Sequence, residues 1–121
     1  PGPGERELAR VRLERHGRAV LARLTGEIDL SNAGTVEDQV SAGLGDTTAV
    51  AVDLSGLSYL DSAGLSLLAR LSGRLTAAAG SLRLVAPPEA VVSRTLAVSG
   101  LAAAIPVDET VEAALAALGP A

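Results

Sequence analysis

The sequence predicts an α/β fold with a mixed, mostly parallel sheet, in the order β-β-α-β-α-β-α-β-α. Apolar and polar residues alternate over 9–14, which is typical of a half-exposed strand. Residues 49–54 form a short, mostly apolar run, which indicates a strand buried on both faces. A leucine stripe at helical spacing follows over 65–79. Alternating strand and helix units imply parallel strands with right-handed crossovers, and the opening hairpin adds an antiparallel edge.

Size and composition indicate one domain with an aliphatic core. The chain has 121 residues, of which 48% are hydrophobic, and Tyr59 is its only aromatic residue. We expect a single domain over 9–119, preceded by a flexible tail or tag remnant over 1–8. The core must then be built from leucine, valine, alanine and isoleucine.

Composition also excludes several classes of function. Cysteine is absent and His16 is the only histidine, so disulfides, thiolate nucleophiles and the usual zinc sites are excluded. A net charge of −4 and the lack of aromatic residues argue against a nucleic-acid partner. No apolar run reaches the length of a membrane span, so we expect a cytoplasmic protein that does not bind membranes, with no metal and no cofactor.

The first elements are a hairpin and a helix. The strand over 9–14 turns at Gly17 into a second strand over 19–25, because glycine can adopt the positive φ of a tight turn. A turn-rich stretch over 25–32 then leads into a helix. Its buried stripe is expected at a spacing of four, with Val36, Val40 and Leu44.

Polar residues precede that helix. Ser31 or Asn32 can cap it, since a short side-chain oxygen accepts from the free amides of a first turn. Glu27 and Asp29 are two carboxylates two residues apart, and paired acids can serve acid–base chemistry. We expect them instead to provide loop solvation and local hydrogen bonding.

The second half continues the alternation. Gly73 is expected at a close packing contact inside the central helix, and Pro87-Pro88-Glu89 is expected to open a later helix, because proline suits a first helical turn. The remaining elements are predicted as a helix over about 62–79, a strand over 82–85, a helix ending at 99–100, an edge strand over 104–107 and a final helix capped by Asp108.

Two predicted loops, 25–32 and 55–64, leave the carboxyl ends of strands, where binding surfaces of such sheets collect. The second contains Asp61-Ser62-Ala63-Gly64 at the point where a strand ends and a helix begins. The amino end of a helix favours anions, because unpaired amides point outward there. Ser62 is therefore either an ordinary cap or a place where a phosphate is tolerated.

Three stretches of the chain resemble the STAS domain of the anti-sigma-factor antagonist family. The stretch 57–65, Leu-Ser-Tyr-Leu-Asp-Ser-Ala-Gly-Leu, is similar to the signature loop of that family. The stretches 24–29 and 98–101 are similar to its second and third motifs, and the order of elements agrees as well. Two positions depart from the pattern: Ala63 stands where a second hydroxyl residue is common, and Ser66 where glycine is frequent.

The resemblance implies a mechanism. In the family, the serine after the aspartate of the signature loop, here Ser62, is phosphorylated by a serine kinase that is also the anti-sigma factor. The unphosphorylated antagonist binds this kinase, which releases the sigma factor; phosphorylation breaks the complex and a phosphatase resets it. The chain is expected to be monomeric when free. The residues expected to contact the partner are Asp29, Ser31, Tyr59, Asp61, Ser62, Ala63, Gly64 and Leu65.

Other functions compete with this one. The resemblance also fits a non-switching STAS subunit of a stress-signalling or transport assembly. An enzyme is not expected, because the sequence offers no convincing nucleophile–base pair, phosphate-binding glycine loop or metal cluster. Nucleotide binding is a further possibility of the family, which the absence of a Walker-type loop disfavours.

Overall fold

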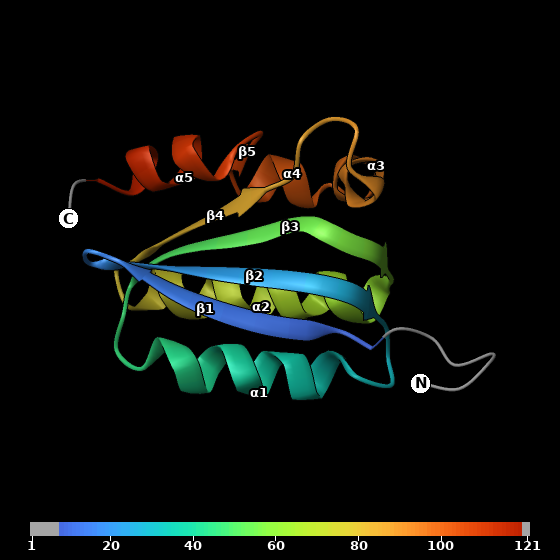
Figure 1. Ribbon diagram of the computed structural model, residues 1–121, viewed down its shortest axis with the longest axis horizontal. Coiled ribbons are helices and arrows are strands. Elements are labelled where there is room, and N and C mark those ends of the chain that lie inside the picture. Colours follow the sequence, from blue (N-terminus) through green and yellow to red (C-terminus); the bar gives the residue numbers. More distant parts are fainter. Residues whose placement is uncertain (1–7, 120–121) are drawn as a thin grey trace.

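The computed structural model describes residues 8–119, which form one five-stranded sheet in the order β1-β2-β3-β4-β5 (Figure 1). Strand β1 pairs antiparallel with β2, and the remaining neighbours are parallel. The predicted mixed, mostly parallel sheet is therefore confirmed. The strands are β1 (Arg10–His16), β2 (Ala19–Ile28), β3 (Ala49–Leu60), β4 (Ser81–Val85) and β5 (Val107–Asp108).

Helices cover the two faces of the sheet unequally. Helices α1 and α2 pack on one face, over the main core, and α5 lies on the other face against β3 and β4 (Figure 1). No helix among residues 8–119 covers β1 and the adjoining part of β2 on that second face. The helices are α1 (Ala33–Leu44), α2 (Ser62–Ala77), α3 (Val91–Ser99), α4 (Leu101–Ala104) and α5 (Val111–Leu118).

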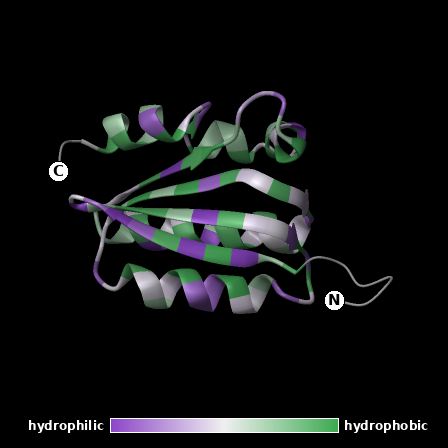
Figure 2. Cartoon of the chain, in the orientation of Figure 1, coloured by the Kyte–Doolittle hydropathy of each residue, from purple (hydrophilic) through white to green (hydrophobic). Residues whose placement is uncertain are grey.

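The core is aliphatic, as the composition requires. Leu24 and Ile28 of β2, Leu54 of β3 and Leu68 of α2 are fully buried in the main cluster. Each buried side chain of this size contributes about 1.5–3 kcal/mol relative to exposure. Figure 2 shows hydrophobic and hydrophilic residues alternating along the front strands, which is the pattern of a sheet with one buried and one open face.

Strands β2 and β3 are longer than predicted. Residues 25–28 and 55–60 were expected as loops because they are rich in glycine and hydroxyl residues. They instead pair with each other, up to Ile28 opposite Leu60. Two register shifts, and Gly26 at a φ of +89°, accommodate the irregularity. The predicted hairpin is confirmed, with Gly17 at a φ of +61° in its turn.

Several predictions for the second half were wrong. Helix α3 begins at Val91 and not at 87–89, because the carbonyl of Pro87 accepts from the amide of Ala90 in a separate turn. The segment 101–104 is a short extra helix, so the last strand starts only at Val107. Gly73 is exposed and has no close neighbour.

The final helix is capped by another residue than predicted. The hydroxyl of Thr110 accepts from the amide of Ala113 at 3.1 Å and caps α5. The carboxylate of Asp108 is instead bound by the guanidinium of Arg83, at 2.7 and 3.1 Å. This ion pair joins β4 to β5, and it raises the pKa of Arg83 through the hydrogen bond to that carboxylate. Of the predicted tail, residues 1–7 lie outside the described residues, and Leu8 forms an isolated bridge to Glu27.

Candidate functional site

The carboxyl ends of β2 and β3 meet at one edge of the molecule, and this brings the two predicted loops together. The amide of Asp61 donates to the carbonyl of Ile28 at 3.2 Å. The turn after β2 leads into α1 and the turn after β3 leads into α2, so both turns end at the start of a helix. This juxtaposition is the one that parallel pairing predicts.

Asp61 links the two turns through its side chain. Its Oδ1 atom accepts from the amides of Ala63 at 2.8 Å and Gly64 at 3.3 Å, which caps α2. Its Oδ2 atom accepts from the amide of Leu30 at 3.3 Å, on the other turn. One carboxylate therefore satisfies orphan donors of a helix end and holds the neighbouring turn in place.

Ser62 is the first residue of α2 and is exposed. Because Asp61 supplies the cap, the hydroxyl of Ser62 is not engaged in capping. It makes no hydrogen bond to any part of the chain that the structure describes. The side chain is therefore open to approach at the positive end of a sixteen-residue helix.

The turn between β2 and α1 is closed by side chains. The Oδ1 atom of Asp29 accepts from the amide of Ser31 at 2.9 Å and from its hydroxyl at 2.5 Å. The side chain of Asn32 accepts from the amide of Asp29 at 3.0 Å and donates to the carbonyl of Glu27 at 2.8 Å. These bonds order the turn itself. Neither Ser31 nor Asn32 caps α1 through its side chain. Asn32 occupies the N-cap position but makes no side-chain hydrogen bond to the helix.

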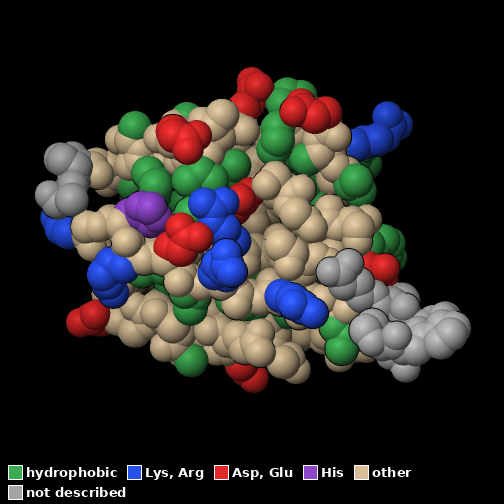
Figure 3. Space-filling model, in the orientation of Figure 1, with side chains coloured by type: hydrophobic (Ala, Val, Ile, Leu, Met, Phe, Trp, Pro, Cys, Tyr) green, Lys and Arg blue, Asp and Glu red, His purple; other side chains and the backbone are tan. Residues whose placement is uncertain are grey.

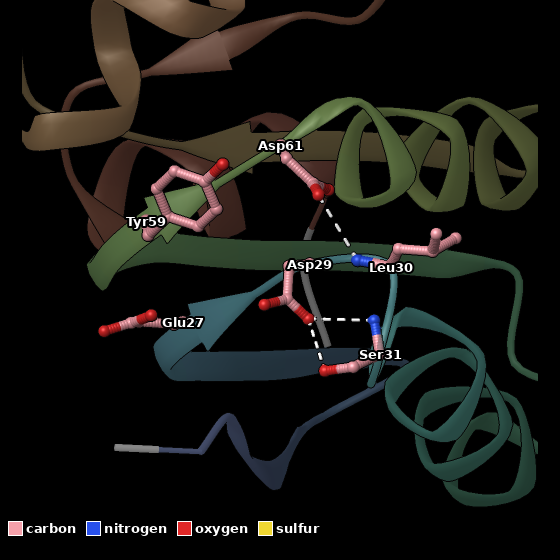
Figure 4. Close-up of a pocket in the computed structure, with 6 residues that line it drawn as sticks. All are labelled: Glu27, Asp29, Leu30, Ser31, Tyr59 and Asp61. Atoms are coloured by element: carbon pink, nitrogen blue, oxygen red, sulfur yellow. Dashed lines mark hydrogen bonds between the residues drawn. The ribbon is translucent and has the colours of Figure 1, made fainter. Parts of the chain in front are cut away.

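The two turns border a shallow hollow of about 570 Å³. Figure 4 shows the carboxylates of Asp29 and Asp61 at its centre, with Tyr59 on one side and Leu30 on the other. Leu30 and Tyr59 are 84% and 47% exposed. An acidic depression flanked by exposed apolar groups suits a cationic side chain with an apolar neighbour. The lining residues are Glu27, Asp29, Leu30, Ser31, Tyr59 and Asp61.

The predicted partner-contact residues fall into two groups. Asp29, Ser31, Tyr59 and Asp61 line the hollow, and Ser62 is exposed next to it. Ala63 and Leu65 are partly buried and pack against the core, and Gly64 is buried. These three residues therefore expose less area to a partner than the first group does.

Gly64 has a structural reason to be glycine. A Cβ atom at this position would lie 3.2 Å from Cγ2 of Ile28 and closer still to the side chain of Leu60. Glycine thus allows the first turn of α2 to sit directly on the ends of β2 and β3.

Sequence reasoning missed Leu30 as a surface residue and did not assign Glu27 to the partner surface. Leu30 could be found as a large apolar residue inside a polar, turn-forming stretch that does not fit the spacing of the buried residues before and after it. Glu27 could be found from the alternation of β2, because Ile28 points into the core and its neighbour therefore points out.

No helix within residues 8–119 is long and apolar enough to cross a membrane. In the same range, no group of three or more histidine, cysteine or acidic residues is arranged to hold a metal ion.

Comparison with known proteins points to one family. The family description "STAS domain" matches residues 10–114. The anti-sigma-F factor antagonist RsfA of Mycobacterium tuberculosis is 32% identical over 108 residues, which cover 87% of this chain and 84% of the relative.

Solved structures agree. An anti-sigma factor antagonist from Mycobacterium paratuberculosis superposes with a TM-score of 0.82 at 29% identity, over 92% of this chain and 94% of that one. The phosphorylated form of the Bacillus cell fate determinant SpoIIAA superposes with a TM-score of 0.67 at 27% identity, over 89% and 98% of the two chains.

Proposed function

The chain belongs to the STAS domain family, and on this basis we propose that it is an anti-sigma-factor antagonist that works by phosphorylation-controlled binding. In its unphosphorylated form it holds an anti-sigma serine kinase, which frees a sigma factor. Phosphorylation of Ser62 ends the complex and a phosphatase restores it. Residues 9–119 act as one unit, monomeric when free and located in the cytoplasm, and the activity is binding without catalytic turnover.

One observation carries this proposal: Ser62 is exposed at the start of α2 while its neighbour Asp61 performs the capping. A serine that capped the helix would have its hydroxyl occupied by main-chain amides, and its modification would disturb the helix. Here the hydroxyl can accept a phosphoryl group with the cap left intact. The amino end of the helix tolerates the added charge, since its dipole favours anions there.

Phosphorylation would act on the partner surface more than on the fold. It adds a charge of about −1.5 to −2 beside Asp61 and close to the turn of Asp29, next to a hollow that has no arginine or lysine in its lining. A partner that places a cationic side chain against these carboxylates must then also desolvate a phosphate. A buried charge without a partner costs roughly 3–5 kcal/mol, and every 1.4 kcal/mol is a factor of about ten in affinity.

The apolar flanks provide the rest of the binding surface. Leu30 and Tyr59 stand on opposite sides of the acidic centre (Figure 4). Few interface residues carry most of the binding energy, and aromatic anchors next to charged groups are common among them. We therefore assign Leu30 and Tyr59 the apolar contacts with the kinase, and Asp29 and Asp61 the charged ones.

The test compares three variants in binding to the serine kinase that wild-type protein captures from its native host. Ser62→Ala should bind as wild type does, and Ser62→Glu should bind at least tenfold more weakly in calorimetry. Ser66→Glu is the matched control for the added charge, because Ser66 is exposed one turn later on the same helix, and it should bind as wild type does. Thermal unfolding of all variants should coincide.

Equal affinity of Ser62→Ala and Ser62→Glu would reject the switch. Protein isolated from its host with no phosphate at Ser62, in stable complex with transport or stress-signalling subunits, would instead support a non-switching STAS subunit.

A further inference from the structure

The open face of the sheet carries a second charged surface, of opposite sign to the hollow. Arg10 and Arg12 lie on β1, and Arg23 and Thr25 lie directly opposite them on β2: Arg12 pairs with Arg23, and Arg10 pairs with Thr25. Directly opposed residues of an antiparallel pair point to the same face. Val11 and Leu13, which alternate with Arg10 and Arg12 along β1, pack against the main core, so the arginines point to the face that α1 and α2 do not cover.

These four residues, which we call the arginine patch, surround a real depression. A hollow of about 430 Å³ is lined by the patch and by Val11. Figure 3 shows arginine side chains gathered over the front strands, where Figure 1 places β1 and β2. Such a concentration of positive charge is unexpected on a chain whose net charge is −4.

The charges of the patch are only partly compensated. Arg23 is bound by Glu14 at 2.7 Å and by Asp53 at 3.1 Å. Within residues 8–119, Arg10 and Arg12 form no ion pair. Arg10 and Arg12 therefore carry the positive charge of the patch that a bound anion can neutralise.

The patch is continuous with the proposed partner site. Arg23, Thr25 and Glu27 follow one another on the same face of β2, and Glu27 lines the acidic hollow. Four residues of strand span about 13 Å. One partner protein can therefore contact the acidic hollow and the arginine patch together.

We propose that the arginine patch binds an acidic, extended segment of the same protein partner, an inference that rests on the proposed antagonist function. Alternate residues of an extended chain are about 6.8 Å apart, so Arg10 and Arg12 match the spacing of carboxylates at every second position of such a segment. Guanidinium groups bind carboxylates through paired hydrogen bonds. The partner thus presents a basic region to the hollow and an acidic one to the patch, which fixes its orientation.

A direct probe of this site is the capped peptide acetyl-(Asp-Ser)₄-amide, with acetyl-(Asn-Ser)₄-amide as its neutral control. Titrated into the isotope-labelled full chain, the acidic peptide should shift the Nε–H signals of Arg10 and Arg12 and the amide signals of β1. The neutral peptide should shift none of them. The interaction should weaken as salt is raised from about 0.05 to 0.5 M, because exposed charges are screened over that range.

Variants then test the assignment. Arg10→Gln together with Arg12→Gln should weaken peptide binding at least tenfold without a change in thermal unfolding. Arg94→Gln, which removes an exposed arginine on α3, should bind the peptide as wild type does. No peptide binding, or equal binding by the double variant, would overturn the proposal. Binding of inorganic tripolyphosphate but not of the peptide would also overturn it, since the patch would then be a small-anion site.

The probe contains no kinase, so its outcome is separate from that of the Ser62 variants. If the acidic peptide does not bind while the Ser62 variants behave as expected, only the proposal for the arginine patch is rejected. If the peptide binds as described and the Ser62 variants do not discriminate, the antagonist proposal falls and the acidic-segment site remains.

Discussion

The side chain of Asp61 accepts a hydrogen bond from the main-chain amide of Leu30, across 31 positions of sequence, at 3.3 Å. The same carboxylate caps α2 through the amides of Ala63 and Gly64. Asp61 therefore fixes the position of the exposed Leu30 relative to the exposed Ser62 at the start of α2. Four predictions concern this arrangement and the packing around it.

Asp61→Ala should destabilise the protein by about 1–2 kcal/mol, because the cap of α2 is lost. Asp61→Asn should cost less, since asparagine caps helices nearly as well and keeps an oxygen for Ala63, although its amide nitrogen cannot accept from Leu30. Urea denaturation of both variants measures the difference. Equal losses for the two would show that the cap contributes little.

Gly64→Ala should destabilise the protein by about 1–3 kcal/mol, the usual cost of overpacking a core. The new Cβ atom would overlap the buried side chain of Leu60 and press on Ile28. Gly73→Ala is the matched control in the same helix: Gly73 is exposed, a Cβ atom added there would meet no other part of the fold within 4 Å, and the variant should gain about 0.5–1 kcal/mol from helix propensity. The prediction fails if both variants shift the urea midpoint in the same direction.

Leu30→Ala should weaken binding of the kinase by more than 1 kcal/mol, roughly fivefold, and should leave stability within about 0.5 kcal/mol of wild type. Leu30 is 84% exposed, so removal of its side chain costs the fold little. Val98→Ala on α3 serves as control, because Val98 is 77% exposed and lies outside the hollow. Calorimetry gives the affinities. Equal affinities of Leu30→Ala and Val98→Ala would remove Leu30 from the partner surface.

The ion pair between Glu37 of α1 and Arg70 of α2 should make a small contribution to stability that depends on pH. Arg70 donates to both carboxylate oxygens of Glu37, at 2.7–3.2 Å, and these hydrogen bonds lower the pKa of Glu37. A carboxyl whose pKa is lower in the folded state contributes its full stabilisation above its unfolded pKa of about 4.3 and loses it as the pH falls through the folded value.

The corresponding measurement is the free energy of unfolding of Arg70→Gln at pH 7 and pH 3. Arg70 is about half exposed and screened by solvent, so the loss at pH 7 should be small, and it should shrink towards pH 3. Arg94→Gln controls for the general effect of removing a positive charge. A loss that is the same at both pH values would contradict the assignment.

The pattern of residues predicted the elements whose signals are local. The alternation over 9–14 and the turn at Gly17 indicated the hairpin, and the spacing of Leu68, Leu71 and Leu75 indicated the buried face of α2. The three stretches that resemble the STAS family predicted the family to which the chain belongs. In each case the information lies within a few residues of the chain.

The predictions from sequence were wrong where pairing between distant strands overrode the local preference for a loop. Residues 25–28 and 55–60 have the composition of loops, yet they extend β2 and β3 because each supplies hydrogen-bond partners to the other. The last strand was misplaced for a different reason: Leu101–Ala104, a run of strong helix formers, folds as α4, so the strand predicted from Ala104 begins only at Val107.

Periodicity and motif thus predicted the fold class, which the structure confirms, and they predicted Ser62, at the carboxyl edge of the sheet, as the candidate phosphorylation site. The division of labour between Asp61 and Ser62, the exposure of Leu30 and the opposed arginines of the open face came from folding. The bond between Asp61 and the amide of Leu30 and the opposed arginines depend on contacts between residues more than ten positions apart, and such contacts leave no local periodicity to find. The cap of α2 is local, but aspartate and serine are both good N-cap residues, and only the structure shows that Asp61 is the one that caps.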